Sequence, residues 1–103
     1  MAKHSDHDFA VELGNIIKNR RELLYLSQLD LAEASGFHRS YISDVERGAR
    51  NLAVRNLRRI CGALDLPLSV VLKQVEIALE RKPAEKKRRS RSDKNVSYQP
   101  QNE

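Results

Sequence analysis

Residues 27–48 run SQLDLAEASGFHRSYISDVERG, and the spacing of residues within them indicates the architecture of the domain. Ser27 followed by Asp30 has the S-x-x-D spacing of a capping box, which predicts that a helix begins here. Gly36 lies where that helix is expected to end, because glycine adopts the left-handed backbone conformation at low cost. Another short helix follows at once and is expected to end at Gly48. The stretch therefore predicts two short helices separated by a tight turn.

The apolar residues of this stretch have the spacing of two helices that cross closely. Leu31, Ile42 and Val45 occupy the positions where the helices meet, and Ala32 occupies the position of closest contact. Phe37 follows the glycine and is placed to fill the gap between the helices. Constraints of this kind at fixed offsets within about 20 residues are typical of a helix-turn-helix.

Helix-period apolar spacing continues on both sides of this motif, without the alternation of strands. An earlier helix is expected from Phe9 to Leu24, a fourth from Val54 to Leu64, and a fifth with Pro67 in its first turn. Short connections between five helices predict a compact all-α domain over residues 9–80. The expected inner face of the fifth helix comprises Leu68, Val71, Leu72, Val75 and Leu79.

Spaced motifs extend the pattern: Leu13-Gly14-x-x-Ile17-x-x-x-Arg21, Leu26-Ser27-Gln28-x-x-Leu31-Ala32, Tyr41-Ile42-Ser43 and Glu46-Arg47-Gly48. With them the chain resembles the phage repressor/Cro-type (XRE) helix-turn-helix family. More narrowly, Arg39-Ser40-Tyr41-Ile42-Ser43 followed by Glu46-Arg47-Gly48-x-Arg50-Asn51-Leu52 is similar to the controller proteins of restriction–modification systems. The resemblance implies a repressor/Cro-like five-helix domain. It also implies that Arg21 and Glu46 form a partly buried, structural ion pair.

The resemblance implies that the helix from about Arg39 to Arg47 enters the major groove of double-stranded DNA. Arg39 and Ser40 lie at its N-terminal end, and an arginine can donate two hydrogen bonds to guanine O6 and N7. Asp44, one turn later, would favour a cytosine amino group. We therefore expect DNA contacts from Ser27, Gln28, His38, Arg39, Ser40, Tyr41, Ser43, Asp44, Arg47, Arg50 and Asn51.

Two residues depart from the family pattern. Ser35 occupies a usually apolar position, which indicates a looser helix or a small cavity. His38 stands where a Ser, Thr or Asp cap is usual, and imidazole is a poor N-cap. We therefore expect a less well-defined start of the recognition helix, or a direct contact of His38 with DNA.

The fifth predicted helix is apolar on more than one side. Val70 and Ile77 lie about two turns apart, with Leu66 and Leu68 nearby. A domain of this size rarely buries apolar residues all around its last helix. We expect these four residues to form the interface of a twofold homodimer, whose recognition helices would lie about one helical turn of DNA apart.

The net charge of +5 lies entirely at the end of the chain. Residues 1–80 hold 11 basic and 11 acidic residues, whereas residues 81–103 hold eight basic and three acidic ones. The latter segment has too few apolar side chains to offset its ordering entropy, so we expect a disordered basic C-terminal tail. Three interpretations of the tail stay open: a solubilising end, a DNA-backbone contact, or a contact with an anionic partner protein or membrane surface.

Other classes of protein find little support. No apolar run reaches 18 residues and the N-terminus is polar, so we expect neither a membrane span nor a signal peptide, and a cytoplasmic protein. Cys61 is the single cysteine, and we expect it to be a buried thiol. His4 and His7 are expected in a solvated N-terminus. The absence of a phosphate loop, nucleophile elbow or metal-ligand spacing predicts no enzyme, no cofactor and no metal site.

These expectations together predict a sequence-specific transcriptional regulator that binds a palindromic operator as a homodimer and is nucleoid-associated when bound. The alternative is the antitoxin of a toxin–antitoxin pair that autoregulates through the same helix-turn-helix. Residues 81–103 lack the apolar anchors that toxin-binding segments usually carry, which favours the regulator. A third hypothesis, general nucleic-acid binding through the tail, predicts equal affinity for operator and random DNA.

Overall fold

The computed structural model describes residues 4–81, and every regular element in that range is a helix. The prediction of a five-helix, all-α domain is confirmed. The predicted tail lies outside the described residues, apart from its first residue, Arg81, which ends the last helix. The helices are α1 (Asp6–Leu23), α2 (Gln28–Ser35), α3 (Arg39–Glu46), α4 (Val54–Ala63) and α5 (Leu68–Arg81).

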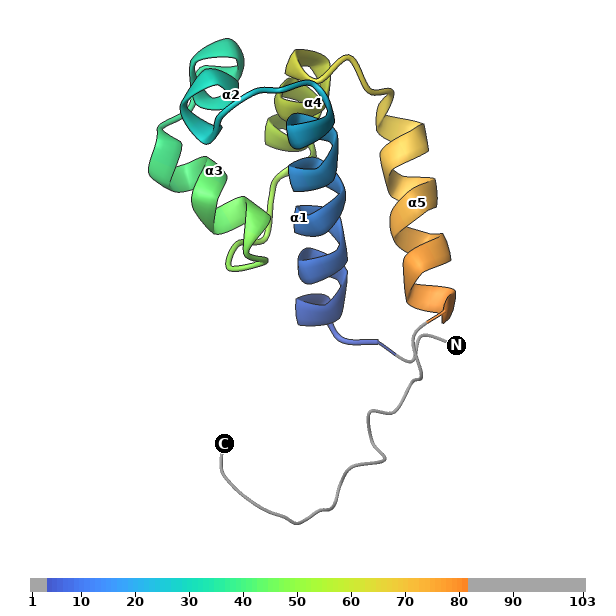
Figure 1. The fold of residues 1–103 in the computed structure, drawn as a ribbon. Helices are drawn as coiled ribbons and strands as arrows, with labels where there is room; N and C mark the ends of the chain where they lie inside the picture. The colour runs from blue at the N-terminus through green and yellow to red at the C-terminus, as the bar shows by residue number, and fades with distance from the viewer. Residues whose placement is uncertain (1–3, 82–103) are drawn as a thin grey trace.

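Helix α1 stands at the centre of the domain. It packs against α5 on one side and against α3 on the other (Figure 1). Helix α4 contacts both α2 and α5, so it connects the pair formed by α2 and α3 to α5. This arrangement leaves α2 and α3 together at one edge, where α3 has a free outer side. No helix within residues 4–81 is both long enough and apolar enough to cross a membrane.

Capping boxes start the first two helices. The Ser27 hydroxyl accepts a hydrogen bond from the Asp30 amide at 2.9 Å, and the Asp30 carboxylate accepts one from the Ser27 amide at 2.9 Å. The backbone hydrogen bond and then the hydroxyl contact lower the pKa of Asp30. Ser5 and Asp8 form a second box, so α1 begins three residues before the predicted start at Phe9. The predicted start of α2 is confirmed.

The structure also accounts for the two departures from the family pattern. Ser35 is buried, and its hydroxyl donates a hydrogen bond to the Leu31 carbonyl oxygen at 2.7 Å, so its polar group is satisfied within α2. His38 occupies the N-cap position of α3. Within residues 4–81 its side chain makes no capping hydrogen bond, as expected of an imidazole.

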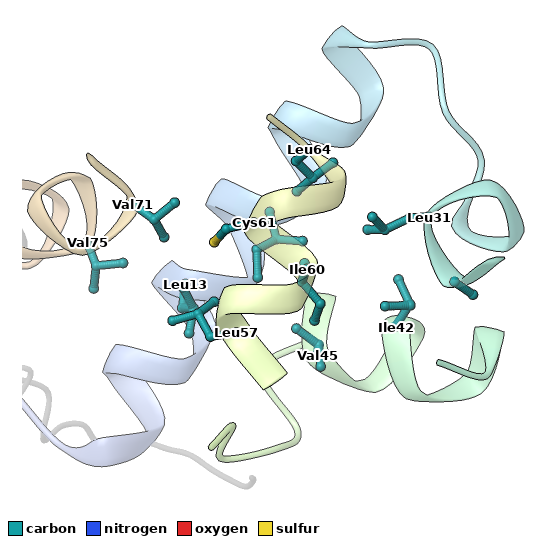
Figure 2. Close-up of a cluster of buried hydrophobic side chains, with 12 residues drawn as sticks. Leu13, Leu31, Ile42, Val45, Leu57, Ile60, Cys61, Leu64, Val71 and Val75 are labelled. Atoms are coloured by element: carbon teal, nitrogen blue, oxygen red, sulfur yellow. The ribbon is translucent and has the colours of Figure 1, made fainter. Parts of the chain in front are cut away.

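The core draws side chains from all five helices (Figure 2). The residues predicted to hold the two motif helices together are almost fully buried, with exposed fractions of 2% or less for Leu31, Ala32, Ile42 and Val45. Deep burial of this kind fixes how α3 is oriented on the domain. The largest fully buried side chains are Ile17, Leu31, Ile42, Ile60, Leu64, Val71 and Val75.

Helix α5 buries a narrower stripe than the sequence predicts. Val71 and Val75 are fully buried, but Leu72 is 37% exposed, so its placement on the inner face was wrong. Each residue turns the helix by about 100°, which carries Leu72 to the edge of the stripe that faces α1. Leu68 and Leu79 are partly buried against the core.

Helices α1 and α3 approach each other most closely at Gly14. A Cβ atom at this position would lie 2.6 Å from the Glu46 carbonyl oxygen and still closer to the Val45 carbonyl oxygen. Only a residue without a Cβ fits there. Gly14 thus lets the end of α3 rest directly on the backbone of α1.

Candidate nucleic-acid interface

The outer side of α3 is an exposed polar surface on a firmly anchored helix. Ile42 and Val45 hold the inner side in the core, while Arg39, Ser40 and Arg47 are exposed on the outer side. A helical period of 3.6 residues separates the two sets. His38 is also exposed, directly before the helix, and so are Arg50 and Asn51 after it.

A buried ion pair ties the end of α3 to α1. Arg21 donates two hydrogen bonds to the Glu46 carboxylate, from Nε to Oε2 at 2.6 Å and from Nη2 to Oε1 at 2.9 Å. Both residues are buried, with exposed fractions of 7% and 6%. The hydrogen bond to Glu46 raises the pKa of Arg21, against the opposing effect of burial. Arg21 also donates to the Leu26 carbonyl oxygen at 2.8 Å, which holds the entry to α2.

Gln28 connects this ion pair to the exposed Arg39. Its amide nitrogen donates to Glu46 Oε1 at 3.0 Å, and its amide oxygen accepts from Arg39 Nη1 at 3.1 Å. A continuous chain of hydrogen bonds therefore runs from Arg21 in α1 to Arg39 at the start of α3. The sequence predicts Gln28 only as a DNA contact; the structure adds an internal role at the same position.

Asp44 gathers two arginines on the outer side of α3. Arg47 donates to Asp44 Oδ1 at 2.5 Å and to the Ser43 hydroxyl at 3.0 Å. Arg50 Nε lies 3.4 Å from Asp44 Oδ2. Three of the predicted DNA contacts, Asp44, Arg47 and Arg50, are thus brought together in one cluster.

Tyr41 lies half-buried beneath this cluster. Its ring centroid is 4.8 Å from that of Phe37, and its hydroxyl accepts a hydrogen bond from Asn56 in α4 at 3.1 Å. The Arg50 guanidinium sits 5.1 Å from the Tyr41 ring centroid, within the range of a cation–π contact. The tyrosine therefore connects the outer surface of α3 to α4 and supports Arg50 in the loop after α3.

Arg59 holds the turn of the motif, a role that sequence reasoning missed. It donates to the carbonyl oxygens of Ser35 and Gly36, at 2.9 and 3.3 Å, and its guanidinium lies 4.2 Å from the Phe37 ring centroid. Gly36 has a φ of 81°, the left-handed conformation that ends α2. The arginine supplies the donors that these last carbonyls lack within their own helix.

Arg20 binds the carbonyl groups at the C-terminal end of α4 in the same way. Its Nε donates to the Leu64 carbonyl oxygen at 2.9 Å, and Nη2 donates to the Asp65 carbonyl oxygen at 3.1 Å. Asp65 itself has a positive φ of 52°. The helical period places Arg20 among the apolar positions of α1, but no local signal identifies carbonyl partners more than 40 residues away.

The four residues predicted to form a dimer interface differ in exposure. Val70 and Ile77 are 38% and 37% exposed, which matches Leu72 on the same helix at 37% and is less than Val54 in α4 at 69%. Leu66, which precedes α5, and Leu68, its first residue, are half-buried and pack against the core. The exposed pair therefore forms the accessible part of the predicted interface.

Two remaining groups bear on chemistry other than DNA binding. Cys61 is buried, and burial raises the pKa of its thiol, which makes it a poor nucleophile. His4 lies within 3.6 Å of Asp8 at the start of α1 rather than in a solvated N-terminus as expected. Among residues 4–81 no three His, Cys, Asp or Glu side chains gather as metal ligands would.

Comparison with known proteins agrees with this geometry. The family described as helix-turn-helix matches residues 17–71. The chain is 39% identical over 66 residues to the ImmF control region 10 kDa protein of Bacillus phage phi105, covering 64% of this chain and 72% of that protein. It is 34% identical over 71 residues to the control protein C.MunI of a Mycoplasma species, covering 68% and 96%.

A solved structure gives the same fold. One chain of the restriction–modification controller protein C.Esp1396I, solved as a tetramer in complex with its natural 35 base-pair operator, superposes with a TM-score of 0.65 at 29% identity. The alignment covers 71% of this chain and 96% of the controller protein. Together with the matched family, these likenesses fix the relationship: the chain belongs to the helix-turn-helix family of the phage repressor (XRE) type.

Proposed function

We propose that this protein is a sequence-specific transcriptional regulator that binds a palindromic operator as a homodimer. The observation that carries the proposal is the exposed outer side of α3, with Arg39 and Ser40 at its N-terminus and a buried ion pair beneath it. Relatives named as control proteins, and the operator complex of C.Esp1396I, support DNA as the ligand. They also favour the regulator over the antitoxin alternative.

Arg39 is the side chain proposed to identify a base. It is exposed at the end of α3 that enters the groove in this motif. Its contact with Gln28 limits its rotamers before DNA arrives, which lowers the entropy lost on binding. Its remaining donors are available for guanine O6 and N7. Ser40 and Ser43 are the proposed neighbouring contacts along the groove.

The surrounding residues are proposed to meet the phosphate backbone. The first amides of α2, next to Ser27 and Gln28, point out of a helix N-terminus, which attracts anions. Arg47, Arg50 and Asn51 are exposed at the other end of the motif. Contacts at both ends would fix the register of α3 without themselves reading sequence. His38 and Tyr41 complete the proposed contact set.

Selection of bound duplexes from a random DNA pool, followed by footprinting, tests the proposal. We expect an enriched palindrome with half-sites about 10 base pairs apart, and an affinity at least roughly 10³-fold above that for random DNA. Equal binding of all sequences would reject specific regulation. Enrichment of a single half-site would reject the dimer while leaving the recognition helix in place.

Arg39→Ala is expected to relax preference at one base pair in each half-site and to cost about 1–3 kcal/mol of binding free energy per site. The reason is the loss of a two-point hydrogen bond to one base. Arg58→Ala, the same change on an exposed arginine of α4, serves as the control and should leave the selected motif unchanged. The motifs are compared by repeating the selection with each variant. An unaltered motif with Arg39→Ala would contradict the assignment.

Val70→Glu is expected to convert the dimer to a monomer, because a charge would be buried in the proposed apolar interface. Leu72→Glu is a matched control, since Leu72 is 37% exposed on the same helix but outside the proposed interface. Sedimentation analysis measures the molecular mass of each variant, and circular dichroism checks that the helices remain. Dissociation by Leu72→Glu but not by Val70→Glu would place the interface on the other side of α5.

A further inference from the structure

Asp44 places a negative charge on a surface that we propose meets a polyanion. Its carboxylate accepts a hydrogen bond from Arg47 on one oxygen and lies 3.4 Å from Arg50 Nε on the other. The side chain is 29% exposed, and the two arginine side chains are 61% and 52% exposed. The carboxylate therefore lies on the face that would approach DNA. Without its two arginine partners it would repel the DNA phosphates.

Each arginine of this cluster is held at two points. Arg47 donates to the Ser43 hydroxyl as well as to Asp44. Arg50 rests on the ring of Tyr41 as well as on Asp44, and that ring is fixed in turn from α4. The two guanidinium groups are consequently arranged by one carboxylate, although both belong to exposed and otherwise flexible side chains.

We propose that Asp44 is a specificity-determining positioning residue, which acts on DNA through Arg47 and Arg50 rather than by contacting a base. This inference rests on the proposed function. Asp44 keeps the two cations in the places they occupy when α3 sits in the groove in one register. In other registers, the same tether prevents them from turning towards the nearest phosphates.

The physical argument compares the two kinds of complex. Binding to arbitrary DNA depends on how many phosphates the cations can neutralise, so a tethering carboxylate weakens it. Binding to the operator uses side chains in defined positions, and pre-arranged arginines lose less conformational freedom there. A single carboxylate thus lowers affinity for random DNA more than affinity for the operator. The ratio of operator affinity to random-DNA affinity rises as a result.

Direct contact between Asp44 and a cytosine amino group is the competing hypothesis. In the structure both carboxylate oxygens already face a guanidinium group, which compensates the charge that would attract that donor. The two hypotheses predict different results. A base contact affects one base pair of the operator, whereas a tether affects all DNA.

The test measures affinities of the full-length chain and its Asp44→Asn variant for the selected operator and for random duplex, across a range of salt concentrations. We expect the variant to bind random DNA about fivefold more tightly, with the slope of log K against log salt steeper by about 1 per protomer. Operator affinity should change less, so the specificity ratio falls. The control is Glu76→Gln, which removes one negative charge from an exposed position on α5.

Two further outcomes would overturn the inference. Asp44→Asn and Glu76→Gln could raise affinity for random DNA equally, which would show that the effect comes from net charge alone. Asp44→Asn could instead relax one base pair of the operator without tightening random DNA, which would establish direct base contact. Failure of wild-type protein to enrich any sequence would reject the proposed function itself, and so is distinct from both.

A double-substitution cycle isolates the tether. In a background carrying Arg47→Gln and Arg50→Gln, Asp44→Asn should no longer tighten binding to random DNA, because no arginine remains to be released. Both arginines are more than half exposed, so the background is expected to fold. Persistence of the full gain in that background would overturn the inference.

Discussion

Glu46→Ala is expected to lower the free energy of unfolding by about 3–5 kcal/mol, the cost of leaving a buried charge without its partner. Arg21 would remain 7% exposed with two donors unmatched. Gln28 would lose its acceptor as well, and with it the fixed position from which it contacts Arg39. Stability should therefore be the property that is affected most, and operator affinity should fall less, as an indirect result.

Thermal or urea denaturation measures the first effect, and operator binding well below the melting temperature measures the second. Glu22→Ala is the matched control, because Glu22 lies 3.9 Å from the same arginine but its side chain is 55% exposed. An exposed pair of this kind contributes at most about 1 kcal/mol. Unchanged stability of Glu46→Ala together with lost DNA binding would show that Glu46 is a DNA contact, not a brace.

Gly14→Ala is the second change with a large expected effect, a loss of about 3 kcal/mol of stability. The added Cβ would meet the carbonyl oxygens of Val45 and Glu46, which are backbone atoms and cannot rotate away. Overpacking at such a contact forces α1 and α3 apart, at a cost that exceeds the gain in helix propensity of about 1 kcal/mol. Because Glu46 lies at the contact, the ion pair with Arg21 would be displaced too.

Gly62→Ala provides the control of opposite sign. Gly62 lies within α4, and apart from its chain neighbours and the backbone of its own helix no heavy atom of the described residues lies within 4 Å of a Cβ built there. The same substitution should then stabilise the protein by up to about 1 kcal/mol through helix propensity alone. Urea unfolding of both variants gives the comparison. A Gly14→Ala protein as stable as Gly62→Ala would show that the two helices are free to move apart.

The parts of the fold that depend on local signals were predictable from the sequence. The capping box at Ser27 and Asp30, the glycine at position 36 and the apolar spacing of Leu31, Ile42 and Val45 each act within a few residues, and each is present in the structure. The capping box at Ser5 was equally local. The apolar pattern begins only at Phe9 and therefore does not extend to this capping box.

The parts that depend on distant partners were not predictable. The side chains of Arg59 and Arg20 donate hydrogen bonds to carbonyl groups 23 to 45 residues away. Gln28 can contact Glu46 only because the fold brings α3 next to the start of α2. Asp44 is similar, since its pairing with Arg50 depends on the loop that follows α3. Such contacts depend on how the helices pack together, which apolar periodicity and capping motifs do not predict.

The division of α3 into an anchored side and an exposed side has a consequence for how new binding preferences arise. An exposed position such as Ser40 can change in evolution, or by design, with little effect on the residues that hold the helix, and the half-buried Ser43 is constrained chiefly by its contact with Arg47. Arg39 is less free than they are, because whatever replaces it inherits Gln28 as a neighbour and, through it, Glu46. Retargeting this protein to a new operator is therefore a problem of choosing residues 28 and 39 as a pair.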